Sequence, residues 1–177
     1  TLYWSRNDLK EADQAFKTAA DLAPLRSPMR VRYADFLVKT GANAEAKNIL
    51  EDASRKLPDY LPPRVFLMKM ACAEHQDEDC AARVQNILAQ DPLSHDALFQ
   101  AGVLSRAKGD AAKAIREFEY LSNTYRQNAQ VRYQLALAYL LSAQNATNPV
   151  KSRNAVDAAD TRLNEAIALD ARFDQAI

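Results

Sequence analysis

The chain has 177 residues, of which 48% are hydrophobic and 26% charged, and 23 Lys and Arg balance 23 Asp and Glu. This balance excludes the clustered basic excess of a nucleic-acid-binding domain. The longest apolar run, residues 135–141, is far too short to cross a bilayer. The scarcity of Gly and the abundance of Ala favour helices over strands.

Helices are predicted in chain order over residues 1–5, 8–21, 27–40, 43–56, 61–74, 77–89, 94–107, 111–124, 128–142 and 149–169. Proline residues lie between several of these predicted helices, because proline cannot continue a helix. Gly41 and Gly109 stand where helices 27–40 and 94–107 end, a place that favours a left-handed residue. Asn148 and Pro149 form a helix start, with an N-cap followed by proline.

The predicted helices 8–21, 43–56, 77–89 and 111–124 share one register with an interval of 34 residues. Four slots recur at this interval: a small residue at Ala12, Ala46, Cys80 and Ala114; a large one at Phe16, Leu50, Val84 and Phe118; a small one at Ala19 and Ala53, replaced by Ile87 and Leu121; and proline at Pro24, Pro58 and Pro92. The helices 27–40, 61–74, 94–107 and 128–142, each the first of a pair, are called the first helices. They have a recurring pattern of their own, best seen in Leu135, Ala136 and Tyr139. The pattern resembles the tetratricopeptide repeat, a helix–turn–helix unit of this length.

The resemblance implies an all-α fold, a right-handed α-solenoid of stacked antiparallel hairpins. It covers residues 1–177 as one array: a partial repeat 1–26, repeats 27–60, 61–94 and 95–128, an enlarged repeat 129–173, and the start of another at 174–177. We expect the chain to be a piece of a longer, bacterial repeat protein. Small residues should allow close helix contact, with Ala34 facing Ala46 and Gly102 facing Ala114. The Trp slot of the family holds Arg30, Arg64, Leu98 and Arg132 instead.

The enlarged repeat carries an 11-residue insertion, because Ala159, Leu163 and Ala166 restore the register late. We expect a lengthened second helix over 149–169. One interpretation is a docking protrusion or dimer contact. The other, which we favour, is a tolerated extension, since surface insertions cost little free energy.

The resemblance implies that the first helices line a concave groove for a protein or peptide partner. The groove residues are expected to be Arg32, Asp35, Lys39, Val65, Phe66, Lys69, Phe99, Gln100, Val103, Arg106, Tyr133, Gln134 and Leu137. Apolar slots with spaced cations suit a peptide with hydrophobic anchors and acidic groups. Alternatively, Phe66, Phe99 and Leu137 pack within the array. Val31 and Asp35 replace the Lys and Asn of the subclass that grips chaperone tails, so that activity is disfavoured.

The predicted function is therefore a non-enzymatic interaction scaffold, with no cofactor, no nucleic acid and no membrane insertion. Self-association through exposed solenoid ends is a further expectation. The alternatives are a regulatory region of a larger enzyme, or an assembly factor of the bacterial cell envelope. Both a cytoplasmic and a periplasmic location stay open.

No catalytic or metal-binding motif is present in the sequence. His75 and His95 are expected to be solvated surface residues. Cys80 occupies a small slot and should be a buried hydrophobe, whereas Cys72 should face the groove. A disulfide between them is the less favoured alternative.

Overall fold

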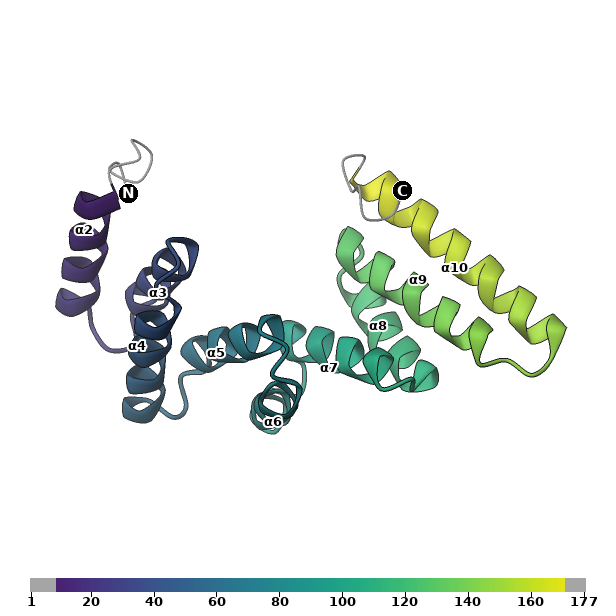
Figure 1. Ribbon diagram of the computed structural model, residues 1–177, viewed down its shortest axis with the longest axis horizontal. Helices are drawn as coiled ribbons and strands as arrows, with labels where there is room; N and C mark the ends of the chain where they lie inside the picture. Colours follow the sequence, from purple (N-terminus) through teal and green to yellow (C-terminus); the bar gives the residue numbers. More distant parts are fainter. Residues whose placement is uncertain (1–8, 171–177) are drawn as a thin grey trace. The chain divides into compact units, whose positions relative to one another are not determined.

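The computed structural model describes residues 9–170, and within them the chain forms helices and no strand (Figure 1). The helices are α2 (Leu9–Leu22), α3 (Met29–Lys39), α4 (Asn43–Lys56), α5 (Leu61–Ala73), α6 (Asp77–Leu88), α7 (His95–Ala107), α8 (Ala111–Thr124), α9 (Ala129–Gln144) and α10 (Pro149–Leu169). The predicted helices 43–56, 111–124 and 149–169 are confirmed to the residue, and the others to within two residues at each end. The predicted helix 1–5 and the repeat start at 174–177 lie outside the described residues.

The chain divides into two compact units, Thr1–Arg83 and Val84–Ile177, with the boundary inside α6. In unit 1, α3 packs against α2, α4 and α5, and α4 also packs against α5. In unit 2, α8 packs against α7 and α9, while α9 packs against α7 and α10. Within each unit, consecutive helices from α2 to α5 and from α7 to α10 therefore pack on one another, as expected for repeats that bury their apolar faces by stacking.

The 34-residue register coincides with the core. The four small-slot residues are almost fully buried, with Ala12, Ala46 and Ala114 at 0% exposure and Cys80 at 1%. In unit 1, the ring of Phe16 stacks on that of Phe36 at a centroid distance of 4.9 Å. Small side chains thus bring the helices together, and the large ones fill the space around them.

In unit 2, the Phe118 ring occupies the space beside Gly102. A Cβ atom added at Gly102 would lie 2.6 Å from Phe118 Cζ, closer than any real contact. Phe118 itself is fully buried, in one cluster with Leu121, Val131 and Leu135. The expectation that Gly102 faces Ala114 is therefore incomplete, because the missing side chain makes room for an aromatic ring.

Three first helices end in the same way, at positions 34 residues apart. Gly41 and Gly109 have positive φ angles of 87° and 79°, which confirms the predicted left-handed ends, and His75 takes the same place with φ 56°. The N–H groups that follow these residues bond back to the carbonyls of Leu37, Ala71 and Ser105. This is the Schellman arrangement, which normally uses glycine because a Cβ strains left-handed backbone.

Replacing His75 by glycine is therefore expected to raise the free energy of unfolding by about 1 kcal/mol, the strain of a left-handed L-residue less the extra chain entropy of glycine. Urea unfolding followed by circular dichroism measures it. The matched change Gly109→Ala should lower stability by a similar amount, since nothing lies within 4 Å of the added Cβ and only the backbone is strained. A His75→Gly protein that is less stable than the parent would contradict the repeated-turn explanation.

The insertion lengthens two helices rather than one. Asn148 accepts hydrogen bonds from the N–H groups of Val150 at 2.8 Å and Lys151 at 3.4 Å, so the predicted cap of α10 is confirmed. However, α9 runs to Gln144, two residues beyond the predicted end. The two helices pack side by side in antiparallel directions (Figure 1). The side chain of Asn145 donates to Gly109 O at 3.2 Å, which ties the loop after α9 to the turn after α7.

Candidate interaction surfaces

The predicted binding residues of unit 1 lie on two neighbouring helices. Arg32, Asp35 and Lys39 are spaced along one face of α3, and all three are partly or largely exposed. Lys39 Nζ donates to Asp35 Oδ2 at 2.7 Å, which leaves Arg32 as the uncompensated charge of this trio. The trio is thus a mixed polar surface rather than an apolar slot.

On α5, the predicted residues Val65, Phe66 and Lys69 form the corresponding stripe. Lys69 is exposed, whereas Val65 and Phe66 are half-buried. Phe66 packs against the unit 1 core cluster. The two interpretations of this phenylalanine are therefore compatible, because one side of the ring contacts the core and the rest stays accessible. We call the α3 and α5 residues together the unit 1 stripe.

The unit 2 stripe consists of Phe99, Gln100, Val103 and Arg106 on α7 with Tyr133, Gln134 and Leu137 on α9. Phe99 and Val103 are half-buried and pack against the unit 2 core. The Phe99 ring meets the Phe118 ring edge to face at 5.7 Å. Phe99 and Val103 therefore belong both to the unit 2 stripe and to the packing between α7 and α8.

Two polar atoms on the unit 2 stripe are buried without a hydrogen-bond partner. They are Oε1 of Gln134, a side chain that is only 9% exposed, and Nε of Arg106. Gln134 was predicted to face the groove, but the structure buries it. An unsatisfied buried polar group costs roughly 1–3 kcal/mol, so these atoms are the least favourably placed on the stripe.

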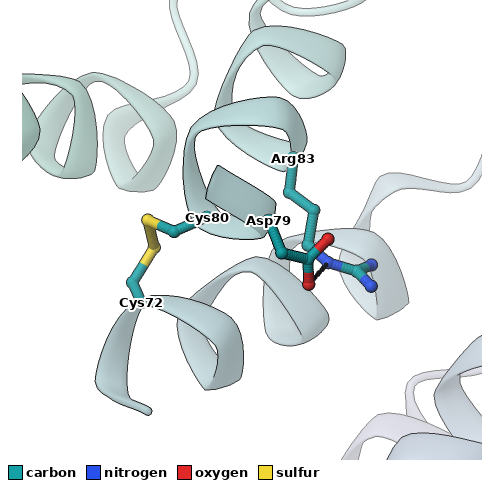
Figure 2. Close-up of a disulfide and its surroundings, with 4 residues drawn as sticks. All are labelled: Cys72, Asp79, Cys80 and Arg83. Atoms are coloured by element: carbon teal, nitrogen blue, oxygen red, sulfur yellow. Dashed lines mark hydrogen bonds and ion pairs between the residues drawn. A yellow bond between two sulfur atoms is a disulfide. The ribbon is translucent and has the colours of Figure 1, made fainter. Parts of the chain in front are cut away.

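Cys72 and Cys80 form a disulfide, with their Cα atoms 4.9 Å apart (Figure 2). The prediction that disfavoured this bond is wrong, and so is the orientation given to Cys72. Its sulfur points to the start of α6 and not away from its sister helix. Beside the bond, Arg83 Nε donates to Asp79 Oδ2 at 2.8 Å, one turn along α6 (Figure 2). Cys80 is buried, as its small slot predicted.

The two histidines differ from one another. His75 is exposed, as predicted. The prediction for His95 is wrong, because its ring is half-buried and meets the Tyr125 ring edge-on at 4.5 Å. Its Nε2 lies 3.4 Å from Asn128 Nδ2. Tyr125 and Asn128 flank the turn before α9, so His95 joins the start of α7 to that turn and is only partly exposed.

Sequence reasoning also missed a role for the arginines in the Trp slot. Arg30 Nη1 donates to the carbonyls of Ala23 and Pro24, at 3.2 and 3.0 Å. Arg64 Nη1 donates to the Pro58 carbonyl at 2.9 Å. Each arginine therefore ties its helix to the turn before it, in place of the packing that Trp supplies. The signal in the sequence is an Arg six residues after a Pro, repeated once at the 34-residue interval.

Two glutamates of α8, Glu117 and Glu119, form contacts with neighbouring helices in which a pKa is shifted. Burial and the hydrogen bond to Glu119, at 2.6 Å, raise the pKa of Tyr139 to about 12. Burial raises the pKa of Glu117, although its hydrogen bond with Ser105 at 3.0 Å opposes that change. Each pair links two helices, since Tyr139 lies on α9 and Glu119 on α8, while Ser105 lies on α7 and Glu117 on α8.

Within residues 9–170, no three His, Cys, Asp or Glu side chains are arranged to hold a metal ion. No helix in that range is long and apolar enough to span a membrane. A crevice beside Lys47, Met70 and Arg83 has a volume of about 10 Å³, room for one water molecule.

Comparison with known proteins finds the tetratricopeptide repeat in the N-terminal part of the chain and the same fold over most of it. A family model of the tetratricopeptide repeat matches residues 3–69. A solved MamA double mutant (RS-1) is similar over 96% of this chain and 89% of its own, with a TM-score of 0.68 and 11% identity. Another MamA structure has a TM-score of 0.67 and 15% identity over 96% and 93% of the two chains.

A third solved structure is YrrB, described as a tetratricopeptide-repeat protein with an unusual peptide-binding site. It has a TM-score of 0.63 and 18% identity over 99% of this chain and 84% of its own. Among curated proteins, none is significantly similar in sequence. The family model covers residues 3–69 and the similar structures are 11–18% identical, so together they support the tetratricopeptide-repeat fold, and the predicted class of an all-α solenoid is confirmed.

Proposed function

We propose that the chain is a non-enzymatic scaffold that binds a peptide or a partner protein on its first-helix stripes. The observation that carries this proposal is the placement of half-buried apolar side chains next to cations on adjacent helices. In unit 1, Phe66 lies one helical turn from exposed Lys69 on α5, and Arg32 stands on neighbouring α3. In unit 2, Phe99 is followed on the same face of α7 by Val103 and Arg106.

The chemistry of the stripes defines the ligand. Half-buried phenylalanines provide apolar contact at a small cost in side-chain entropy, because the core already holds them. The cations beside them suit carboxylates on the ligand. We therefore propose a segment with hydrophobic anchors and acidic residues. YrrB, whose description names a peptide-binding site, is a relative in fold for which a peptide ligand is stated.

The test is selection of peptides from a displayed random library against the full chain, followed by fluorescence-polarisation titration of the best binder. The variants Arg32→Ala, Lys69→Ala and Arg106→Ala are each measured with the same peptide. At least one of them is expected to weaken binding about tenfold, the loss of one charge-assisted contact.

The controls remove equally charged side chains from the second helices. Arg55→Ala on α4 and Lys113→Ala on α8 lose well-exposed cations, at 79% and 55% side-chain exposure. They are expected to leave the affinity unchanged. If these controls weaken binding as much as the stripe variants, a general charge effect explains the binding and the proposal fails.

The disulfide favours one alternative, an assembly factor of the cell envelope. Disulfides persist in oxidising compartments such as the bacterial periplasm and are rare in the cytosol. Cys72 and Cys80 are the only cysteines in the sequence, and both are in the bond. We infer that the chain works in an oxidising compartment. Maleimide–polyethylene glycol labelling of protein trapped by acid in its native cells should give no mass shift before reduction and two additions after it. Full labelling without reduction would exclude this alternative.

A further inference from the structure

Two arginines share one glutamate near the C-terminal end of α10. Arg132 Nη1 on α9 donates to Glu165 Oε2 at 2.6 Å, and Arg162 Nη1 donates to both oxygens of that carboxylate, at 2.7 and 2.9 Å. The side chains of Arg132 and Arg162 are only 16% and 30% exposed. In both, Nε is buried without a hydrogen-bond partner. The site therefore has an excess of positive charge and two unused donors.

A hollow of about 330 Å³ opens beside this cluster. It is lined by Arg126, Arg132, Glu165, Ala168 and Leu169. Arg126 brings a further guanidinium to the wall, and no ion pair engages it in the described chain. Ala168 and Leu169 form an apolar wall. A hollow of this size and mixed lining can accept a small organic group that carries a negative charge.

The same slot in unit 1 shows what Arg132 lacks. Arg30 and Arg64 each donate to a carbonyl at the proline of the turn before them. In the register, Arg126 replaces that proline, and Arg132 donates to Glu165 instead of to the preceding turn. In this repeat, the hydrogen bond from the arginine to the carbonyl of the preceding turn is therefore absent. A second cation, Arg126, and the open hollow lie there instead.

We propose that this hollow binds a carboxylate of a partner protein, with the carbon chain that carries it lying on Ala168 and Leu169. Three guanidinium groups around one glutamate leave net positive charge for a second carboxylate, which can accept from Arg132 and Arg126. The apolar wall favours an organic carboxylate over inorganic phosphate. The site is separate from the first-helix stripes, because Arg126 lies in the turn after α8 and the wall belongs to α10.

Nitrogen-15 NMR of arginine Nε–H groups tests the site on the full chain, since a buried Nε–H exchanges slowly enough to be seen. The probes are N-acetyl-leucine, N-acetylglutamate α-amide, neutral N-acetyl-leucinamide and sodium phosphate. We expect saturable shifts of the Arg132 signal with one or both carboxylates, and none with the neutral amide. The better carboxylate tells a C-terminal from a side-chain source.

Two variants decide the outcome. Arg132→Gln is expected to weaken N-acetyl-leucine binding at least about tenfold. Arg126→Gln changes an exposed side chain and is expected to keep the fold, so it gives the answer if Arg132→Gln unfolds the unit. It should weaken binding several-fold. Arg153→Gln, which removes an exposed cation elsewhere on α10, is the matched control and should bind as the parent does. Unchanged binding in Arg126→Gln, or phosphate binding as tight as that of the carboxylates, overturns the proposal.

Discussion

Replacing Phe118 by alanine is expected to lower the free energy of unfolding of unit 2 by about 3–5 kcal/mol, the largest effect of any single change considered for this chain. The ring is fully buried and lies against the Phe99 ring and the backbone of Gly102. Its removal leaves a cavity where α7 and α8 meet, since a glycine cannot fill the space. Urea unfolding followed by circular dichroism at 222 nm measures the change.

Two companion variants make this prediction specific. Phe99→Ala removes a half-buried ring of the same kind and should cost roughly half as much. Gly102→Ala should lower stability by about 1–3 kcal/mol through overpacking against Phe118, despite the better helix propensity of alanine. If Gly102→Ala is as stable as the parent, or Phe118→Ala loses less than Phe99→Ala, the described contact between α7 and α8 is wrong.

Loss of the disulfide is expected to cost about 2–3 kcal/mol, the entropy of closing a short loop in the unfolded chain. The bond joins residues eight apart in sequence and links the end of α5 to the start of α6. The double variant Cys72→Ala/Cys80→Ala removes it, and at Cys80 the change in packing is small because alanine occupies that slot in the other repeats. Chemical denaturation of the parent, with and without a reducing agent, is compared with that of the variant.

The reducing agent serves as an internal control. It should lower the stability of the parent to about that of the double variant and leave the variant unchanged. A parent whose denaturation midpoint does not respond to complete reduction would show that the Cys72–Cys80 bond does not stabilise the hairpin.

The helices were predictable because each repeat has similar residue types at the same positions. Small residues at Ala46 and Ala114 and left-handed ends at Gly41 and Gly109 recur in one register, so local propensity and packing agree. The left-handed turn at His75 was not predicted, because histidine does not favour a positive φ angle. Only the 34-residue interval from Gly41 and Gly109 indicates it. The end of α9 lies two residues beyond the predicted one because the insertion adds residues to both helices that it joins.

The disulfide was missed for a geometric reason. The register places Cys72 at the position of Val38 and Arg106, near the end of a first helix, where the side chain was expected to face the groove. Only the crossing of α5 and α6 brings its Cα within 4.9 Å of that of Cys80. The propensity of each helix contains no information about how closely the two approach one another.

The parts of the candidate surfaces that sequence could not predict depend on contacts between helices far apart in the chain. Arg132 and Glu165 are separated by 33 residues and meet only because α10 packs along α9. Likewise, burial of Gln134 could not be read from its place on the first-helix face, where repeat position suggests exposure. Repeat position predicts which residues share a helix face, but not how much of that face its neighbours cover.

The central claim is that the first-helix stripes bind the partner, and amide NMR shift mapping with a selected peptide tests it most directly. The account predicts the largest shifts at residues on α3 and α5, or on α7 and α9, with small changes on α4 and α8. Largest shifts on α4 and α8, with the stripes unaffected, would contradict it.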